Sequence, residues 1–356
     1  NRIVLSPMQM YLAGDDGIAT EWHFQHLAKY AVAGAGCVFT EVLPPEARGR
    51  NTHWDLGIWD DAQIPALSRI AAFIEKTGAV PAAQTGHAGT KAARQRPFDG
   101  LQPLSDDDTA RGEPPWQPVG PMDEANVEGY HLPHALSASE IHQLVDDFGQ
   151  GVRRLGASGF RFLEVHAAHG YLLHSFYSPI SNRRTDAYGG DRSRRMRFAL
   201  EVAESVRANW PDEFPLSFRI SSIDAVDGGW GLDDSLILVR ELKSRGVDIV
   251  DCSSRGVGAA NSLARLEKEG KSLEEGYQVP YSEYLRTEVP IPTIAVGLIT
   301  RAEFAEKILQ EGRADLIALG RELLYNPHWV LHAASALENA TKWNDWPPSW
   351  NWWLEK

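Results

Sequence analysis

The sequence predicts an α/β fold, a (β/α)8 TIM barrel in which a single domain spans residues 1–356. Two observations lead to this prediction. Eight short apolar segments recur along the chain, and each is followed by a longer stretch in which apolar residues have helical spacing. The short segments are nearly continuously apolar, which is typical of parallel strands that helices cover on the outside.

The eight strand candidates set the expected order of the barrel. They occupy residues 3–8, 36–42, 80–86, 160–166, 215–221, 248–253, 291–297 and 314–320. A doubly wound open sheet is the alternative, but it needs a Gly-x-Gly-x-x-Gly directly after an early strand, and no such motif follows one. In a barrel the functional groups gather at the carboxyl ends of the strands, so the residues that end these segments are the candidates for a site.

The segments between the strands carry helix signals. Residues 21–33 and 64–76 both have apolar side chains at helical spacing. Further along, Asp233 and Asp234 favour the start of a helix and Gly246 suits its end. We therefore expect helices on the outer side of the barrel in these places.

Two capping boxes mark further helix starts. They pair Ser137 with Glu140 and Thr300 with Glu303. In such a box the hydroxyl accepts a backbone N–H three residues on, and the carboxylate accepts the N–H of the capping residue. We expect one helix to begin just after Ser137 and another just after Thr300.

Two segments do not fit the strand and helix alternation. Residues 87–133 are rich in Pro, Gly and Asp without a clear period, which predicts a partly ordered lid after the third strand. Residues 343–356 hold five of the twelve tryptophans. So much aromatic surface is unfavourable in water, so this tail is expected to pack on the barrel or on another subunit.

The composition excludes several classes of partner. A formal net charge of −13 disfavours nucleic acid and anionic membranes, because an acidic surface repels both. The sequence has no apolar run of the roughly 18 residues needed to span a bilayer. Its two cysteines, Cys37 and Cys252, lie in predicted strands, which argues against a disulfide framework or a cysteine metal cluster. A cytoplasmic protein is predicted.

The chemistry is expected at the end of the fourth strand. An apolar run stops there at His166, and His169, Gly170 and Tyr171 follow at once. Two neighbouring imidazole N–H groups can hold and polarise one oxygen of a substrate. A zinc site is an alternative, but no acidic residue or third histidine stands at helical spacing with the pair. Histidines that only satisfy loop carbonyls are the other alternative.

Further candidates lie near other strand ends. Tyr171 and Tyr11 are possible proton donors, because a tyrosine with a pKa near 10 keeps its proton at neutral pH, although simple packing explains a tyrosine equally well. Arg219 emerges from an apolar strand and needs an anionic or strongly accepting partner. Gln84 offers both a donor and an acceptor, which suits an amide-like ring edge.

A phosphate site is predicted after the last two strands. Gly297 ends the seventh, and Gly320 with Arg321 ends the eighth. Barrels often bind phosphate at this position with backbone N–H groups and a helix N-terminus, and an arginine adds a bidentate charge. The alternative is a pair of ordinary turn glycines beside a surface arginine.

Together these motifs resemble the old yellow enzyme family over essentially the whole chain, and within it the bacterial xenobiotic-reductase and thermophilic-type branch. The resemblance rests on motifs in matching order and spacing, namely Ser6-Pro7-Met8, residues 84–87, His166-x-x-His169-Gly170-Tyr171, residues 181–190, Arg219, residues 295–297 and residues 318–321. Members of this branch are FMN-containing (β/α)8 barrels that reduce activated alkenes with NADPH or NADH.

The resemblance implies a role for each candidate in FMN binding. Arg219 would face the N1/C2 edge of the flavin, Gln84 would bond its pyrimidine edge, and Gly297, Gly320 and Arg321 would hold the phosphate. The resemblance places further contacts to the ring at Pro7, Met8, Gln9 and Val42.

It also implies a mechanism. His166 and His169 would hold the carbonyl or nitro oxygen of a small-molecule substrate, so that hydride from flavin N5 reaches the β carbon. Tyr171 would protonate the α carbon, and Tyr11 would line the pocket. The protein would then be an ene-reductase and a homo-oligomer, a dimer or tetramer, with the 350–353 cluster reaching a neighbouring subunit. Metal ligands are not expected.

The chain departs from the branch in three places. Gln9 stands where a cysteine usually touches the flavin, which leaves the redox potential and the substrate range open. Thr90 replaces an arginine after Ala88-Gly89, which removes a charge near the mouth of the site. Residues 191–195 differ from the usual motif at a helix start.

Three other functions remain open from the sequence. The same flavin could serve an oxidative demethylase or dehydrogenase. The chain could also be a flavin-binding barrel without turnover, with Gln9 marking lost reactivity. A metallohydrolase built on the histidines would instead hold zinc and no flavin.

Overall fold

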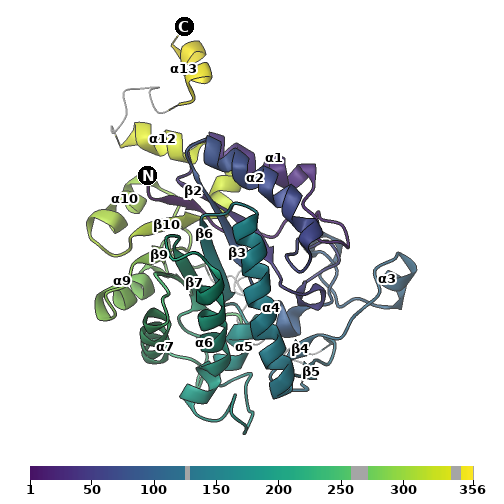
Figure 1. Cartoon of the computed structure of the whole chain (residues 1–356). Helices are drawn as coiled ribbons and strands as arrows, with labels where there is room; N and C mark the ends of the chain where they lie inside the picture. Colours follow the sequence, from purple (N-terminus) through teal and green to yellow (C-terminus); the bar gives the residue numbers. More distant parts are fainter. Residues whose placement is uncertain (125–128, 258–271, 338–345, 356) are drawn as a thin grey trace.

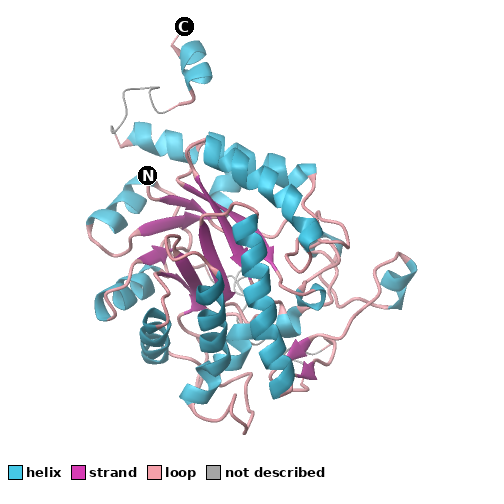
Figure 2. Ribbon diagram, viewed as in Figure 1, coloured by secondary structure: helices cyan, strands magenta, loops and turns pink. Residues whose placement is uncertain are grey.

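Eight parallel strands close into a barrel in this computed structural model, which describes residues 1–124, 129–257, 272–337 and 346–355 (Figure 1, Figure 2). Around the barrel the strand order is β1-β10-β9-β8-β7-β6-β3-β2. The strands are β1 (Ile3–Leu5), β2 (Cys37–Leu43), β3 (Val80–Thr85), β6 (Phe162–Ala167), β7 (Leu216–Ser221), β8 (Ile249–Ser253), β9 (Thr293–Ala295) and β10 (Leu316–Leu319). All eight predicted strands and the predicted barrel are confirmed.

Helices surround the barrel on its outer side, as the cyan ribbons around the magenta strands in Figure 2 show. The longer ones are α1 (Glu21–Val32), α2 (Ile64–Lys76), α4 (Ala138–Ala157), α6 (Arg192–Asn209), α7 (Leu232–Ser244), α9 (Val279–Glu288), α10 (Ala302–Gln310) and α12 (Trp329–Ala336). Among the described residues, none of the helices has the length and apolar character to cross a membrane.

Local signals explain several helix ends. The Glu140 N–H donates to Ser137 Oγ at 3.3 Å, and Glu140 Oε2 accepts the Ser137 N–H at 2.8 Å, so the predicted capping box of α4 is confirmed. The chain leaves α7 through Gly246, which has a φ of +84°, a conformation that favours glycine.

The second predicted capping box is wrong. The α10 helix has Arg301 as its N-cap residue, and no side chain of its own first turn caps it. The N–H and the hydroxyl of Thr300 donate instead to Glu275 Oε1, at 3.1 and 3.2 Å. A carboxylate from a distant part of the chain therefore takes the place that the sequence pattern gave to Glu303.

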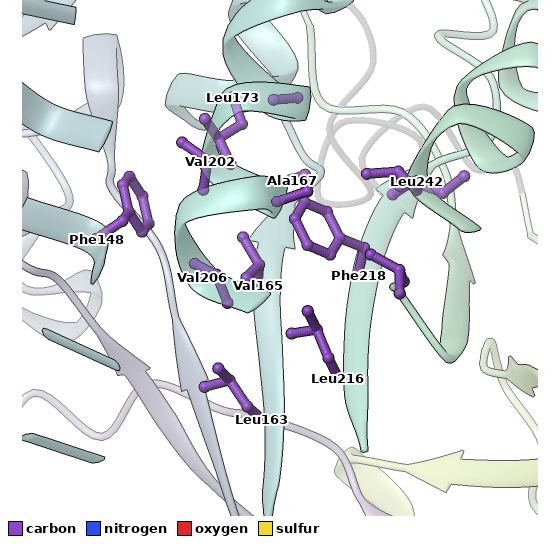
Figure 3. Close-up of a cluster of buried hydrophobic side chains, with 14 of the residues drawn as sticks. Phe148, Leu163, Val165, Ala167, Leu173, Val202, Val206, Leu216, Phe218 and Leu242 are labelled. Carbon is purple, nitrogen blue, oxygen red and sulfur yellow. The ribbon is translucent and has the colours of Figure 1, made fainter. Parts of the chain in front are cut away.

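An apolar core lies between the outer face of the barrel and the surrounding helices. In Figure 3 alternate side chains of β6 and β7 lie against those of α4, α6 and α7. These side chains are Leu163, Val165, Ala167, Leu216 and Phe218 from the strands and Phe148, Val202, Val206 and Leu242 from the helices. Because side chains alternate along a strand, the residues between them point into the barrel.

The interior of the barrel changes from apolar to polar along the strands. One buried cluster fills its amino end, formed by Val4, Cys37, Phe39, Ala82, Phe162, Ile294 and Ala318. Two residues further along, the strand register aligns a polar layer: Gln84 lies beside Glu164, Glu164 beside Ser217, and Arg219 beside Asp251. This polar layer forms the floor under the carboxyl ends of the strands.

The segment after β3 contains only short pieces of regular structure. They are η3 (Gly89–Lys91), η4 (Pro97–Asp99), α3 (Asp106–Ala110) and β4 (Val119–Gly120), and β4 pairs with β5 (His134–Ala135). In Figure 1 α3 projects from the side of the barrel.

The tryptophan-rich tail contains α13 (Pro348–Leu354). Trp346 stacks on His328 with the ring centroids 5.6 Å apart, whereas the side chains of Trp352 and Trp353 are 55% and 71% exposed. Trp343 lies outside the described residues. Trp346 thus packs against the start of α12, and the rings of Trp352 and Trp353 lie edge-on to each other with the centroids 4.6 Å apart.

Candidate active site

A cavity of about 620 Å³ opens where the strands end, a size in the usual range of small-molecule sites of roughly 300–1,000 Å³. Segments that follow β1, β6, β8, β9 and β10 contribute to its wall, together with β7. Seven of the predicted site residues line it, namely Pro7, Met8, His169, Arg219, Gly297, Gly320 and Arg321. The structure therefore joins the predicted phosphate site, the predicted ring contacts after β1 and one of the two histidines in one space.

Two glycines line the end of the cavity formed after β9 and β10, where a side chain at Gly297 would crowd its neighbours. A Cβ atom at Gly297, where φ is +120°, would lie 3.0 Å from Gln278 Nε2 and 3.0 Å from a ring carbon of Tyr277. A Cβ at Gly320 would lie 3.4 Å from Met8 Sδ. Gly320 is also the N-cap residue of α11 (Arg321–Tyr325), so backbone N–H groups start a helical turn here. This end suits the phosphorylated tail of FMN.

Arg219 lies in the cavity wall and is held there by two neighbouring side chains. Its Nη1 donates to Ser6 Oγ at 3.0 Å, and its Nε lies 3.5 Å from Asp251 Oδ2. Within the described residues, Nε is buried without a hydrogen-bond partner. A largely buried guanidinium in the cavity wall fits the accepting edge of a flavin ring, so the residues present fit the cofactor that the resemblance implies.

A pair of buried carboxyls accompanies Arg219. Glu164 accepts hydrogen bonds from Gln84 Nε2 at 2.8 Å and from Ser217 Oγ at 3.0 Å. Burial, and then the nearby Asp251, raise the pKa of Glu164 to about 8. Burial also raises the pKa of Asp251, although Arg219 opposes this shift. The polar layer therefore holds a proton on Glu164 at neutral pH, and the Gln84 amide is engaged with that residue.

The two histidines and Tyr171 come together at the end of β6. The His166 ring lies edge-on to both neighbours, with its centroid 5.0 Å from that of His169 and 4.8 Å from that of Tyr171. Burial, and next the positive charge of Arg219, hold the pKa of both imidazoles well below the ordinary value. Both rings are thus neutral at pH 7 and can serve as N–H donors without bringing a charge.

The bonding of each imidazole differs. His169 Nε2 lies 2.6 Å from Ser253 Oγ, and when that hydroxyl donates to Nε2 the imidazole proton is on Nδ1. His166 Nδ1 is buried and has no hydrogen-bond partner in the described part of the chain. Ser253 therefore orients His169, whereas Nδ1 of His166 makes no hydrogen bond within the described residues.

Burial raises the pKa of both candidate tyrosines, Tyr171 and Tyr11. Burial, and after it the neighbouring Tyr171, raise the pKa of Tyr11, whose φ is +59° and whose ring lies edge-on to Phe98 with the centroids 6.5 Å apart. Both phenols consequently keep their protons throughout the neutral pH range.

The position that departs from the branch is bonded to the backbone of β2. Gln9 Oε1 accepts the Val42 N–H at 3.2 Å, so the side chain that replaces the usual cysteine is held against another predicted ring contact. The other predicted residues, Tyr11, Val42, Gln84, His166 and Tyr171, are not part of the cavity wall, and neither is Gln9.

Several residues of the site were not among the sequence candidates. Glu164 and Asp251 belong to the polar layer, Ser253 bonds His169, and Lys91 donates to the His169 carbonyl. The alternation of side chains along a strand could have indicated Glu164. This residue stands two positions before His166 and therefore points into the barrel as well. Lys91 comes from a segment without periodic apolar residues, and no sequence pattern there indicated that it bonds to His169.

The described residues contain no group of three His, Cys, Asp or Glu side chains placed to hold a metal ion.

Comparison with known proteins identifies the family. The family model described as NADH:flavin oxidoreductase / NADH oxidase matches residues 1–340. NADPH dehydrogenase of Geobacillus thermodenitrificans (strain NG80-2) is 39% identical over 338 residues, which cover 95% of this chain and 90% of the relative. NADPH dehydrogenase of Listeria innocua serovar 6a is 38% identical over 338 residues, with 95% and 91% covered.

Solved structures show the same fold. A 2-naphthoyl-CoA reductase complex superposes with a TM-score of 0.83 at 20% identity and covers 94% of this chain and 50% of that chain. Morphinone reductase superposes with a TM-score of 0.75 at 24% identity, with 94% and 86% covered. The match over residues 1–340 and the relatives at 38–39% identity show that the chain belongs to the NADH:flavin oxidoreductase / NADH oxidase family, the old yellow enzyme family, as an FMN-dependent NAD(P)H oxidoreductase.

Proposed function

We propose that this enzyme is an ene-reductase that acts on small α,β-unsaturated carbonyl or nitro compounds. FMN, when bound, supplies the hydride for the β carbon. The observation that carries the proposal is the group of three rings at the end of β6. The neutral imidazole of His169 and the protonated phenol of Tyr171 have their ring centroids 5.0 and 4.8 Å from that of the neutral His166.

In this proposal His166 and His169 bind the carbonyl or nitro oxygen. Their N–H groups would strengthen their hold as negative charge develops on that oxygen, which is how preorganised donors lower a barrier. Since the rings are neutral, they stabilise the charge by hydrogen bonding and do not protonate the oxygen outright. The Ser253 contact at 2.6 Å limits the rotation of His169.

Tyr171 gives its proton to the α carbon. The raised pKa keeps the phenol protonated until a carbanion forms beside it, and a positioned acid of this kind contributes roughly 10²–10⁴-fold to a rate. Tyr11 is outside the wall of the 620 Å³ cavity, and we propose that it lines the substrate side of the site next to Tyr171, which raises its pKa.

The cofactor contacts follow the resemblance. Arg219 is proposed to bind the flavin ring edge where negative charge collects on reduction, and the phosphate would lie against Gly297, Gly320 and Arg321. The other contacts to the ring are assigned to Pro7, Met8, Gln9, Val42 and Gln84. Residues 87–133 are proposed as a lid, which the bond from Lys91 to the His169 carbonyl supports.

One experiment tests the proposed reaction. The purified protein should be yellow, lose its flavin absorbance on anaerobic addition of NADPH, and regain it on addition of 2-cyclohexenone with formation of cyclohexanone. If NADPH bleaches the flavin and neither cyclohexenone nor a nitroalkene restores it, the enzyme is not an ene-reductase. Bleaching by a methylated amine in place of NADPH would support the demethylase alternative.

A further inference from the structure

The peptide bond between His169 and Gly170 has both of its polar atoms bonded to side chains from other elements. Its oxygen accepts a hydrogen bond from Lys91 Nζ at 2.5 Å. Its N–H donates to His174 Nδ1 at 2.7 Å. Lys91 belongs to η3, after β3, and His174 to α5 (Leu172–Tyr177), so this one peptide unit is held from two sides.

The backbone at this point needs support. His169 has a φ of +60° and Gly170 a φ of +74°, so two consecutive residues are in the left-handed region. A non-glycine residue is strained there and keeps this conformation only where the surroundings hold it. A change in the backbone dihedrals of His169 would redirect its Cα–Cβ bond and move the imidazole relative to His166.

Lys91 also ties two loops together. Its Nζ donates to the carbonyl of Gly256 at 2.9 Å, in addition to that of His169. The two backbones touch here, because a Cβ on Gly170 would lie 2.1 Å from the Gly256 oxygen, and one on Gly256 would lie 2.2 Å from His169 Cα. The Lys91 amino group, whose pKa burial lowers to about 7, thus bridges the loop after β6 and the loop after β8.

His174 is held in a single orientation by Asp224. Since Nδ1 accepts the Gly170 N–H, the imidazole proton is on Nε2, which donates to Asp224 Oδ1 at 2.8 Å. Asp224 Oδ2 accepts from Ser178 Oγ at 2.7 Å and from the Trp230 N–H at 2.8 Å. The side chains of His174 and Asp224 are fully buried, so this support is rigid.

The other side of His169 is fixed independently. Its own N–H donates to Ser221 Oγ at 2.9 Å, and its Nε2 contacts Ser253. With the next peptide held by Lys91 and His174, the backbone on both sides of His169 is determined by residues outside the catalytic group.

We propose that Lys91 and the His174–Asp224 pair are positioning residues that hold the His169–Gly170 peptide and thereby aim the His169 imidazole at the substrate oxygen. This inference rests on the proposed function, in which His169 binds that oxygen. Neither residue touches the substrate; each acts through His169.

A mutant cycle on the FMN-loaded enzyme tests the proposal. Lys91→Met removes the donors and keeps the aliphatic chain, and Lys91→Arg keeps donors. His174→Leu removes the acceptor, and His174→Asn offers an amide oxygen near the position of Nδ1. Each is combined with His169→Ala. The readouts are the dissociation constant of phenol, from the change in flavin absorbance, and kcat/KM for 2-cyclohexenone.

Lys91→Met and His174→Leu should each weaken phenol binding about tenfold or more and lower kcat/KM similarly, while Lys91→Arg and His174→Asn recover most of the loss. In the His169→Ala background the same substitutions should have almost no further effect, because residues that act through one group are not additive with it. Lys76→Met, at the exposed end of α2, is the control and should match the wild type.

Two outcomes separate the inference from the function on which it rests. If His169→Ala weakens phenol binding and Lys91→Met does not, or if Lys91→Met weakens it equally with and without His169, the positioning role is wrong. If His169→Ala leaves phenol binding unchanged, the proposed substrate contact fails first. Should Lys91→Met not retain FMN, Lys91→Gln takes its place in the same cycle with the same two readings.

Discussion

At the end of β6 burial acts on three titratable side chains in a way that suits the proposed reaction. It removes the charge from His166 and His169 and keeps the proton on Tyr171. Hydrogen-bond donors without charge and an acid that is never lost at neutral pH are what the reduction of a polarised alkene requires. The sequence shows which residues stand here. The loss of charge on His166 and His169 depends on burial and on the nearby Arg219, which only the fold brings about.

Replacing His166 and His169 together with alanine should weaken phenol binding by about 1–3 kcal/mol, since two neutral hydrogen bonds are lost. The FMN content should stay near that of the wild type, because the proposed phosphate contacts lie after β9 and β10. Titration of each protein with phenol, followed by flavin absorbance, measures the change. Unchanged phenol affinity in the double variant would reject their assigned role.

Replacing Tyr171 with phenylalanine should slow the reduction of 2-cyclohexenone about 10²-fold or more, because the proton donor is removed. Reduction of the flavin by NADPH needs no such proton and should be nearly unaffected. Stopped-flow measurement of the two half-reactions separates them, and Tyr11→Phe, which keeps Tyr171, serves as the matched control. An equal loss in both half-reactions would show that Tyr171 is not a dedicated donor.

Helix ends show how far a local pattern can be used. The box of Ser137 and Glu140 forms because both partners lie in one turn of α4. The similar pattern of Thr300 and Glu303 fails because Glu275 reaches the same backbone from outside the helix: its Oε1 also accepts the Arg301 N–H at 3.2 Å, and its Oε2 accepts Arg301 Nε at 2.9 Å. Thr300 lies in the cavity wall, so this distant cap also shapes the site.

Glu275→Gln should therefore lower the free energy of unfolding by about 1 kcal/mol, as for the loss of a helix cap, and Glu303→Gln should change it by less than about 0.5 kcal/mol. Urea unfolding of the two FMN-loaded variants at pH 7 measures both values. A larger effect at Glu303 than at Glu275 would restore the local capping box.

At the scale of the whole molecule, charged side chains lie inside the barrel, and most buried apolar side chains lie between the strands and the surrounding helices. Glu164, Asp251 and Arg219 lie within the barrel, above the apolar cluster that fills its amino end. With one guanidinium for two carboxyls, the interior is close to neutral only while one carboxyl keeps its proton. The stability of the folded barrel is accordingly linked to pH.

The sign of this linkage follows from Glu164. Its pKa rises from the model-compound value of 4.5 to about 8 on folding, so between these pH values the folded protein binds the proton more strongly than the unfolded chain. This contribution to stability is present in full below pH 4.5 and is lost as pH rises towards 8.

Relative to wild type, Glu164→Gln should therefore gain stability as pH rises from about 5 to about 8, with a slope of up to about 1.4 kcal/mol per pH unit. Urea unfolding of both proteins over this range measures the difference. A difference in unfolding free energy that stays constant over the range would contradict the shifted pKa.

The sequence by itself determined the barrel, the order of its strands and the residue types at their carboxyl ends, because the period of apolar residues and the continuously apolar strands are local signals. It also named His166, His169, Tyr171 and Arg219, because polar residues at the end of an apolar run stand out. Only the tertiary structure decided which groups bond one another across strands. Lys91 and Gly256, His174 and Asp224, and Glu275 and Thr300 are far apart in the chain, and such contacts depend on how the closed barrel brings its loops together.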